Sequence, residues 1–264
     1  DADDRARLAA SGLEAGPVSL QQLSTPMNRA VTVARMQFVN KYTFVWLPLI
    51  ILGTTLVLSI AIFAMIPYGG AKYGGGSQVP IWYFFGLGIM SLSYTFPFSQ
   101  ALSITRREFF FGTMLAALVT AAMLGLAFAV GGAIERATGG WGVNGYFFSL
   151  DWIWTAGAIG AGIFFGVTAM LLFILGFWGA TIYRRYGALG LTVTLVTAGL
   201  LLVAALWLVA RLEAWAAVGA WLTALGPMGL TGVLAIAAVA GGGGPFAPAP
   251  PPLPRGGGPS AGPG

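Results

Sequence analysis

The sequence predicts an all-α, polytopic membrane protein with six transmembrane helices, both termini in the cytoplasm, and an amphipathic interfacial helix before the first span. Composition is the first observation behind this prediction. Hydrophobic residues make up 57% of the 264 residues and charged residues only 8%, whereas a soluble domain carries about a quarter charged residues. So few charges cannot solvate a globular surface of this size, and most of the surface must therefore face lipid.

Six apolar stretches are the second observation. Each has about the 20 residues that a helix needs to cross a hydrocarbon core of roughly 30 Å. None contains Asp, Glu, Lys or Arg, and such long uncharged runs are typical of transmembrane helices. The predicted spans cover residues 47–67, 81–104, 112–134, 153–181, 187–210 and 215–240.

The basic residues predict the orientation. Placing the N-terminus inside leaves only Lys72, Arg136 and Arg211 of the 13 basic residues outside. The other ten then lie in the cytoplasm, as the positive-inside rule requires: Arg5, Arg7, Arg29, Arg35, Lys41, Arg106, Arg107, Arg184, Arg185 and Arg255. Because these residues sit at helix ends rather than in a stripe with interleaved aromatics, they argue against nucleic-acid binding.

The chain contains no Cys and no His. This excludes disulfides, thiolate nucleophiles, histidine bases and the usual zinc sites. We therefore expect no cofactor, no metal and no enzymatic activity in this chain.

Three regions are predicted along the chain. Residues 1–26 form a polar extension and residues 241–264 a Gly/Pro-rich tail, both expected to be disordered. Residues 27–240 form the membrane domain. We interpret Met27 as a native start, with the segment before it as an extended reading frame and the tail as a frameshift.

Two outer loops differ in character. Residues 68–80 are Gly-rich and are interpreted as a flexible link. Residues 135–152 hold several aromatic residues, which we interpret as an interfacial aromatic belt in preference to a binding site. These residues are Trp141, Tyr146, Phe147, Phe148 and Trp152.

Residues 27–41 are predicted to form a basic amphipathic helix that lies in the inner membrane interface. Its apolar stripe would face lipid and its basic residues the anionic headgroups. An ordinary juxtamembrane anchor and an elbow that supports a cytoplasmic partner are both compatible with this pattern. The residues that carry it are Arg29, Val31, Arg35, Phe38 and Lys41.

The inner loop between spans two and three contains the run Thr105, Arg106, Arg107, Glu108 and Phe109. A positive-inside hairpin explains the arginines, and a short helix lying along the membrane explains the whole run. Glu108 favours the second interpretation, because an acidic residue contributes nothing to topology.

This run, extended to Ser103 and Gly112, is similar to the loop after span two in the membrane subunits of ABC-2 type transporters, the six-span permeases of bacterial exporters. The helix before span one matches as well, so the resemblance covers residues 27–240. It implies a coupling helix that docks on a separate ABC ATPase subunit, with Glu108 paired to a basic residue there, Arg106 and Arg107 holding the helix against the membrane or an acidic patch, and Thr105 as its N-cap.

The resemblance also implies partners and a location. A second permease copy or a homologous permease would complete the pathway, in contact with membrane lipid, in the bacterial cytoplasmic membrane. ATP and Mg²⁺ would be bound by the partner ATPase, since this chain has no Gly-x-x-x-x-Gly-Lys-Ser/Thr. The Gly/Pro-rich tail departs from the family, whose members end soon after span six.

Polar groups in span two could line a translocation path or be satisfied between neighbouring helices, and both interpretations stay open. They lie around Pro97, which bends the helix, and comprise Ser91, Ser93, Tyr94, Thr95, Ser99 and Gln100. In span four Ala158, Gly162 and Gly166 permit a close helix contact. We expect that contact within the chain rather than at a dimer face.

Two other classes of function compete with an ATP-driven permease. One is a non-transporting membrane scaffold or assembly protein, and the other is an ATP-independent channel or carrier. Ion-coupled carriers generally place charged residues within their spans, and none of the six predicted spans does. No residue selects a substrate.

Overall fold

The computed structural model describes residues 42–95 and 106–243. The predicted interfacial helix 27–41, both terminal regions, Ser99, Gln100 and Thr105 lie outside these residues. The described part is mostly helical, and its elements in chain order are η1 (Tyr42–Trp46), α3 (Leu47–Met65), β1 (Lys72–Tyr73), η2 (Gly75–Ser77), α4 (Gln78–Met90), η3 (Ser91–Thr95), α6 (Arg106–Ala137), η4 (Gly140–Asn144), β2 (Gly145–Tyr146), α7 (Asp151–Trp154), α8 (Gly157–Arg211) and α9 (Trp215–Gly243).

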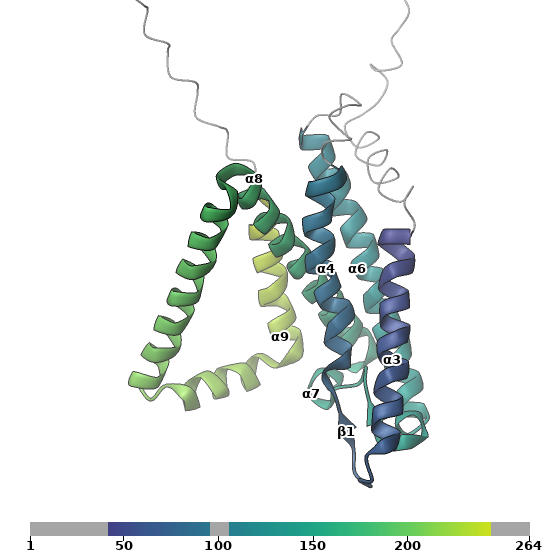
Figure 1. Cartoon of the computed structure of the whole chain (residues 1–264). Helices are drawn as coiled ribbons and strands as arrows, with labels where there is room; N and C mark the ends of the chain where they lie inside the picture. Colours follow the sequence, from purple (N-terminus) through teal and green to yellow (C-terminus); the bar gives the residue numbers. More distant parts are fainter. Residues whose placement is uncertain (1–41, 96–105, 244–264) are drawn as a thin grey trace, which may run out of the picture.

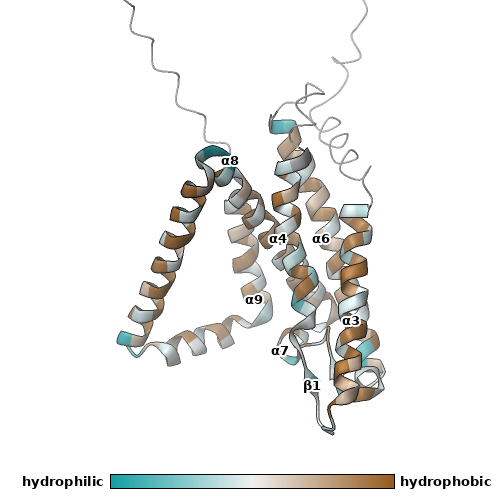
Figure 2. Ribbon diagram, viewed as in Figure 1, coloured by the Kyte–Doolittle hydropathy of each residue, from teal (hydrophilic) through white to brown (hydrophobic). Residues whose placement is uncertain are grey.

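Four helices of the described part are long and apolar enough to cross a membrane. They run over Tyr42–Met65, Arg107–Ala137, Gly157–Arg211 and Trp215–Gly241. Their outward faces are strongly hydrophobic, as Figure 2 shows for α3 and α8. The predicted helical membrane protein is confirmed to this extent. The second predicted span corresponds to α4 and η3, which together run from Gln78 to Thr95, where the described residues stop.

Gly187 divides α8 into two limbs. Its φ of 71° lies in the left-handed region that glycine tolerates, and its ψ of −171° is not helical. The first limb ends at Tyr186 and packs in the helix bundle. The second limb, residues 188–211, turns back and runs away from the bundle (Figure 1). Two predicted apolar stretches, 153–181 and 187–210, therefore form one element with a sharp bend.

The last predicted stretch, 215–240, is also bent. Gly226 has a φ of 60° and a ψ of −177°, and Pro227 follows it inside α9. A proline has no N–H to donate and its ring clashes with the preceding turn, so the helix changes direction here. The first limb of α9 runs from the far end of α8 toward the bundle, and the second limb runs from there toward the bend of α8 (Figure 1). The predicted span 215–240 thus corresponds to one apolar helix with a bend in it.

The core of the molecule lies among α3, α4, α6 and the first limb of α8. Large buried side chains there include Phe84, Leu124, Phe128, Phe165 and Phe173. The α4–α8 crossing is a contact of backbone with backbone. A Cβ added to Gly88 would collide with the carbonyl oxygen of Phe173, and one added to Gly176 with that of Phe85. Glycine has no side chain, so it allows the two backbones to come this close. Apolar helices in lipid associate through such close packing.

Charged residues of the described structure gather at two ends of the bundle, and Arg211 and Glu213 lie apart from them, at the turn between α8 and α9. At one end, termed the basic end, lie the start of α6 and the bend of α8, with Arg106, Arg107, Arg184 and Arg185 (Figure 1). At the other, termed the loop end, lie residues 66–77 and 138–156.

The Gly-rich link predicted for residues 68–80 is an ordered part of the loop end. Lys72 and Tyr73 pair in parallel with Gly145 and Tyr146, and residues 75–77 form a turn of 3₁₀-helix. The prediction of a flexible link is therefore wrong for this segment. Its glycines allow close contacts, since a Cβ on Gly76 would meet the hydroxyl of Ser59 and the ring of Phe147.

Candidate functional site

The basic end begins with the first turn of α6. Arg106, Arg107, Glu108 and Phe109 start a helix that continues to Ala137. The expectation of a separate short helix along the membrane therefore does not hold for these four residues, because no break separates them from the apolar helix. Phe109 is buried, and its cluster includes Phe110 and Phe177. The turn is thus fastened to the bundle by its aromatic side.

Arg184, at the bend of α8, connects this bend to η3. Its Nη2 donates a hydrogen bond of 2.8 Å to the carbonyl oxygen of Ser93 in η3. Arg107 lies with its guanidinium carbon 5.7 Å from the ring centroid of Phe111, and Arg185 lies 5.3 Å from that of Tyr186. Exposed guanidinium groups held in this way give the basic end a net positive surface beside the half-buried Glu108.

Of the polar residues predicted for a translocation path, the structure describes the side chains of Ser91 and Ser93. Ser91 is 2% exposed, and its hydroxyl donates to the carbonyl oxygen of Leu87 at 2.9 Å. Ser93 is half-buried and offers its carbonyl oxygen to Arg184. Tyr94 and Thr95 belong to η3. The hydroxyl of Ser91 is therefore satisfied within its own helix, whereas the alternative interpretation of span two expected a partner on a neighbouring helix.

The small residues of the fourth predicted span contact α6 of the same chain. A Cβ on Gly162 would lie 2.8 Å from the carbonyl oxygen of Gly125, and one on Gly166 would lie 3.2 Å from that of Ala121. Ala158 is half-buried one turn before. These glycines thus occupy an internal helix contact, so an interface with a second copy would need other residues.

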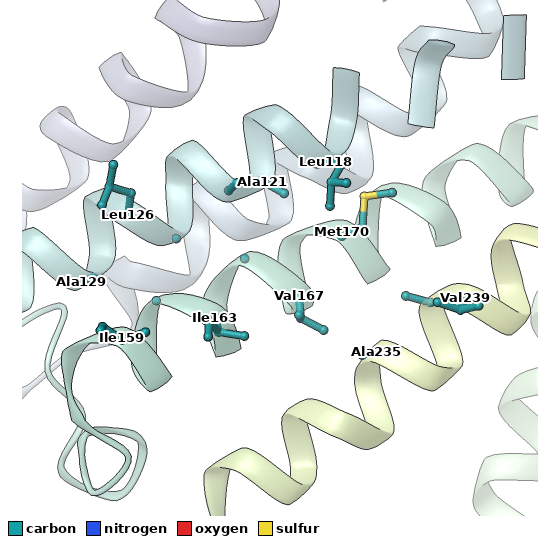
Figure 3. Close-up of a pocket in the computed structure, with 15 residues that line it drawn as sticks. Leu118, Ala121, Leu126, Ala129, Ile159, Ile163, Val167, Met170, Ala235 and Val239 are labelled. Atoms are coloured by element: carbon teal, nitrogen blue, oxygen red, sulfur yellow. The ribbon is translucent and has the colours of Figure 1, made fainter. Parts of the chain in front are cut away.

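An apolar groove of about 490 Å³ lies between α6, the first limb of α8 and the second limb of α9. Figure 3 shows Leu118, Leu126, Ile163, Met170 and Val239 around it. Its floor is the glycine contact of α6 with α8. Every lining side chain is apolar, so the groove provides a surface for hydrocarbon.

Glu135, near the end of α6, is the most buried acidic group of the described structure. Its side chain is 0% exposed, although it follows the apolar run of α6 directly. A buried carboxylate is costly unless hydrogen bonds satisfy it. The loop end supplies them, because the segment from Thr138 to Ser149 folds back over the helix end.

Five donors converge on this carboxylate. Oε2 accepts from the indole Nε1 of Trp141 and from the backbone N–H of Phe147, both at 2.8 Å. Oε1 accepts from the N–H and the hydroxyl of Ser149, at 2.8 and 2.7 Å. The N–H of Phe148 lies 3.1 Å from both oxygens. Hydrogen bonds to an ionised acceptor are about twice as strong as neutral ones, and a set made only of donors fits a carboxylate.

The aromatic residues of this loop face inward rather than into a membrane interface. Phe147 and Phe148 are 1% and 3% exposed. The ring of Phe148 packs edge-on against that of Phe128, 5.2 Å away. The predicted aromatic belt is therefore wrong for these two residues, whereas Trp152 is 43% exposed. The belt was predicted from composition alone. Composition does not show that the backbone N–H groups of Phe147 and Phe148 bind Glu135 while their rings face inward.

A second polar cluster lies on the surface of the loop end. The Nη2 of Arg136 forms an ion pair of 2.8 Å with Oδ1 of Asp151, and its guanidinium carbon lies 5.1 Å from the ring centroid of Trp154. The hydroxyl of Tyr73 donates to Oδ2 of Asp151. The hydrogen bond to Asp151, with burial and the charge of Asp151 as smaller causes, raises the pKa of Tyr73 from 10.0 to about 12.

This cluster gives a pH prediction. Because the folded pKa of Tyr73 exceeds its ordinary value, the stability that its hydroxyl contributes is complete below pH 10 and is lost as the pH rises toward about 12. Asp151→Asn should bring the phenolate transition back toward pH 10. The measurement is the ultraviolet absorbance change on titration, with the Tyr73→Phe protein subtracted. An unchanged transition in the Asp151→Asn protein would contradict the assignment.

Known proteins do not assign this chain. No protein family, no curated protein and no solved structure matches it. Among the described residues there is also no group of three or more acidic residues that could hold a metal ion. Its function must be argued from its own residues and contacts.

Sequence reasoning missed Glu135. One signal could have found it, because this acid follows 23 consecutive uncharged residues, 112–134, and precedes an aromatic loop. An acid at that depth needs donors close by, and the nearest available donors are the backbone and indole groups of that loop.

Proposed function

We propose that the chain is the transmembrane permease subunit of an ATP-driven ABC-2 type exporter in the bacterial cytoplasmic membrane. The observation that carries this proposal is the Thr-Arg-Arg-Glu-Phe run at 105–109, whose described residues open the longest uninterrupted helix of the bundle. An acid between arginines and buried aromatics, at the tip of a helix bundle, offers a partner protein both a charge and a rigid contact.

The continuity of α6 supports a mechanical role for this turn. Thirty-two residues of α6 span about 48 Å at 1.5 Å per residue, from Arg106 to the loop end. A partner that moves the first turn would therefore move the helix as one piece. Arg184 ties the bend of α8 to η3 beside it, so the same push would reach three elements.

The proposal includes six spans with both termini in the cytoplasm. Its support is the charge count of ten inside against three outside, together with the bend at Gly187, which would let the chain cross the membrane again. The basic end would face the cytoplasm, and the loop end would face the exterior. A second copy or a homologous permease would complete the pathway, with two ATPase subunits below.

ATP and Mg²⁺ would be bound by the ATPase, because the sequence has no P-loop pattern of its own. In this proposal the chain hydrolyses nothing. ATP binding would favour one of two arrangements of the membrane domain, as a ligand shifts any two-state equilibrium. The apolar lining of the groove and the uncharged spans suit an amphipathic or apolar substrate more than an ion.

Glu108→Arg tests the proposal. If Glu108 pairs with a basic residue of the ATPase, the reversal should reduce the amount of ATPase that co-purifies with the permease by at least about tenfold, equivalent to about 1.4 kcal/mol. Membrane insertion and size-exclusion behaviour should stay normal. The proposal expects a gene for an ABC ATPase beside the permease gene, and its product is the partner to express. A compensating reversal of the basic residue of that ATPase should restore the complex.

Glu213→Arg is the matched control, because Glu213 is an exposed acid in the turn between α8 and α9 that the proposed topology places outside. It should leave co-purification unchanged. Normal ATPase binding and stimulation by the Glu108→Arg protein would contradict the coupling role. Substrate flux without any ATPase would instead favour the channel or carrier, and a lack of both would favour the scaffold.

A further inference from the structure

We propose that residues 138–149, termed the lid, form a closure over the loop end that the carboxylate of Glu135 holds shut as a latch. All five donors to Glu135 come from the lid: the indole of Trp141, the backbone N–H groups of Phe147, Phe148 and Ser149, and the hydroxyl of Ser149. One side chain of α6 therefore holds both halves of the lid.

The lid does not keep its shape by local preference. Five of the six residues from 139 to 144 have positive φ, and two of them, Trp141 at 59° and Asn144 at 53°, are not glycines. Non-glycine residues in this region are uncommon and carry a conformational cost, which persists only where surrounding contacts enforce it. The indole of Trp141 is held by Glu135, and the side-chain amide of Asn144 donates to the carbonyl oxygen of Gly69. A lid strained in this way is poised to relax once the carboxylate is lost.

The lid also has contacts other than those to Glu135. The rings of Phe147 and Phe148 are buried in the core, and the indole of Trp154 donates to the carbonyl oxygen of Phe148 at 3.3 Å. Asn144 donates to the carbonyl oxygen of Gly69 at 3.2 Å, and Gly145 and Tyr146 pair with β1. The charged groups nearby are engaged elsewhere, because Arg136 pairs with Asp151 and Lys72 donates to the carbonyl oxygen of Phe63 at 2.8 Å. The donors of the lid are thus what compensates the charge of Glu135 within the described residues.

The lid covers buried groups of the bundle. The ring of Phe147 sits against Gly76, and a Cβ on Gly145 would collide with the ring of Phe63. Ser77, next to Gly76, is 1% exposed. Opening the lid would withdraw Phe147 from this place and admit water to Ser77. Any transmission of movement from the basic end through α6 to the latch rests on the proposed function. The closure of the lid by Glu135 does not.

The experiment uses the fact that the chain contains no cysteine. Ser77→Cys adds a single, nearly isosteric thiol under the lid, and its reaction rate with a polar maleimide is measured on the full chain in nanodiscs, where both faces are accessible. We expect slow labelling of the Ser77→Cys protein. Adding Glu135→Gln should make the labelling at least tenfold faster, because the amide nitrogen of the glutamine would face the hydrogen-bond donors of the lid and could not accept from them. Adding Glu213→Gln instead should leave the rate unchanged.

Two further variants keep the test decisive. Ser91→Cys reports the buried interior near the basic end, where Ser91 is 2% exposed, and it should stay slow when combined with Glu135→Gln. Equal acceleration at both positions would mean general unfolding and would overturn a local lid. Ser149→Ala removes one of the six hydrogen bonds to Glu135, the one from the hydroxyl, and should give an intermediate rate at Ser77→Cys. Unchanged labelling in both Glu135→Gln and Ser149→Ala proteins would overturn the latch. Neither result depends on whether an ATPase binds.

Discussion

Replacement of Gly176 by Val should remove most of the folded protein. Gly176 lies on the first limb of α8, where its Cα faces the backbone of Phe85 in α4. Any Cβ placed there collides with the carbonyl group of Phe85, which is part of a helix and cannot rotate away as a side chain would. The two helices would have to separate, and Gly88, which has the same relation to the backbone of Phe173, would lose its contact as well.

The expected cost follows from the environment. Forcing extra atoms into a well-packed site costs about 1–3 kcal/mol, and more where only backbone can move. We expect about 3 kcal/mol or more for Gly176→Val, since helices in lipid are held together by close packing rather than by release from water. The measurement is the fraction of monodisperse protein that remains after heating in detergent, followed by size-exclusion chromatography.

Matched controls are available on both helices. Gly179 lies one turn beyond Gly176, and Gly86 lies two residues before Gly88, and a Cβ on either would meet nothing within 4 Å. Gly179→Val and Gly86→Val should therefore behave like the parent protein. If Gly176→Val also behaves like the parent, the α4–α8 crossing is not a backbone contact in the membrane-embedded protein.

The apolar stretches were accessible to prediction because a span depends on composition alone. A run without charges is recognisable whatever its neighbours are. The bends were harder, because Gly187 and Gly226 differ from other glycines only in the tertiary contacts that select a left-handed φ. The pair Gly226–Pro227 did carry a local signal, since proline interrupts any helix. A sequence window that averages hydropathy hides such a signal.

The loop end was not predictable by the same reasoning. The aromatic residues Phe147 and Phe148 suit both a membrane interface and a buried core, and composition cannot distinguish the two. What decides is the long-range contact of their backbone N–H groups with Glu135. Arg106 and Glu108 differ from these aromatic residues, because local sequence is enough to predict that they start a helix. Local sequence does not predict that this helix continues without a break as α6.

Replacement of Glu135 by Ala should cause the second large loss of stability. The change leaves three backbone N–H groups, one indole N–H and one hydroxyl without their acceptor. Each buried donor that loses its partner costs about 1–3 kcal/mol, and water that enters the small space recovers part of this. We expect a net loss of about 3 kcal/mol in the free energy of unfolding, measured by thermal or denaturant unfolding in detergent.

Single donors provide the scale for this loss. Ser149→Ala removes one hydroxyl hydrogen bond and should cost about 1 kcal/mol, and Glu213→Ala, at an exposed position, should change the free energy by no more than about 0.5 kcal/mol. The Glu135→Ala protein should therefore be less stable than the Ser149→Ala protein by a clear margin. Equal losses would show that the carboxylate is held by Ser149 alone, and that the backbone N–H groups of the loop find other partners. In that case the strained residues Trp141 and Asn144 would be held by Thr138 and Gly69, whose oxygens accept hydrogen bonds from them at 3.2 Å each.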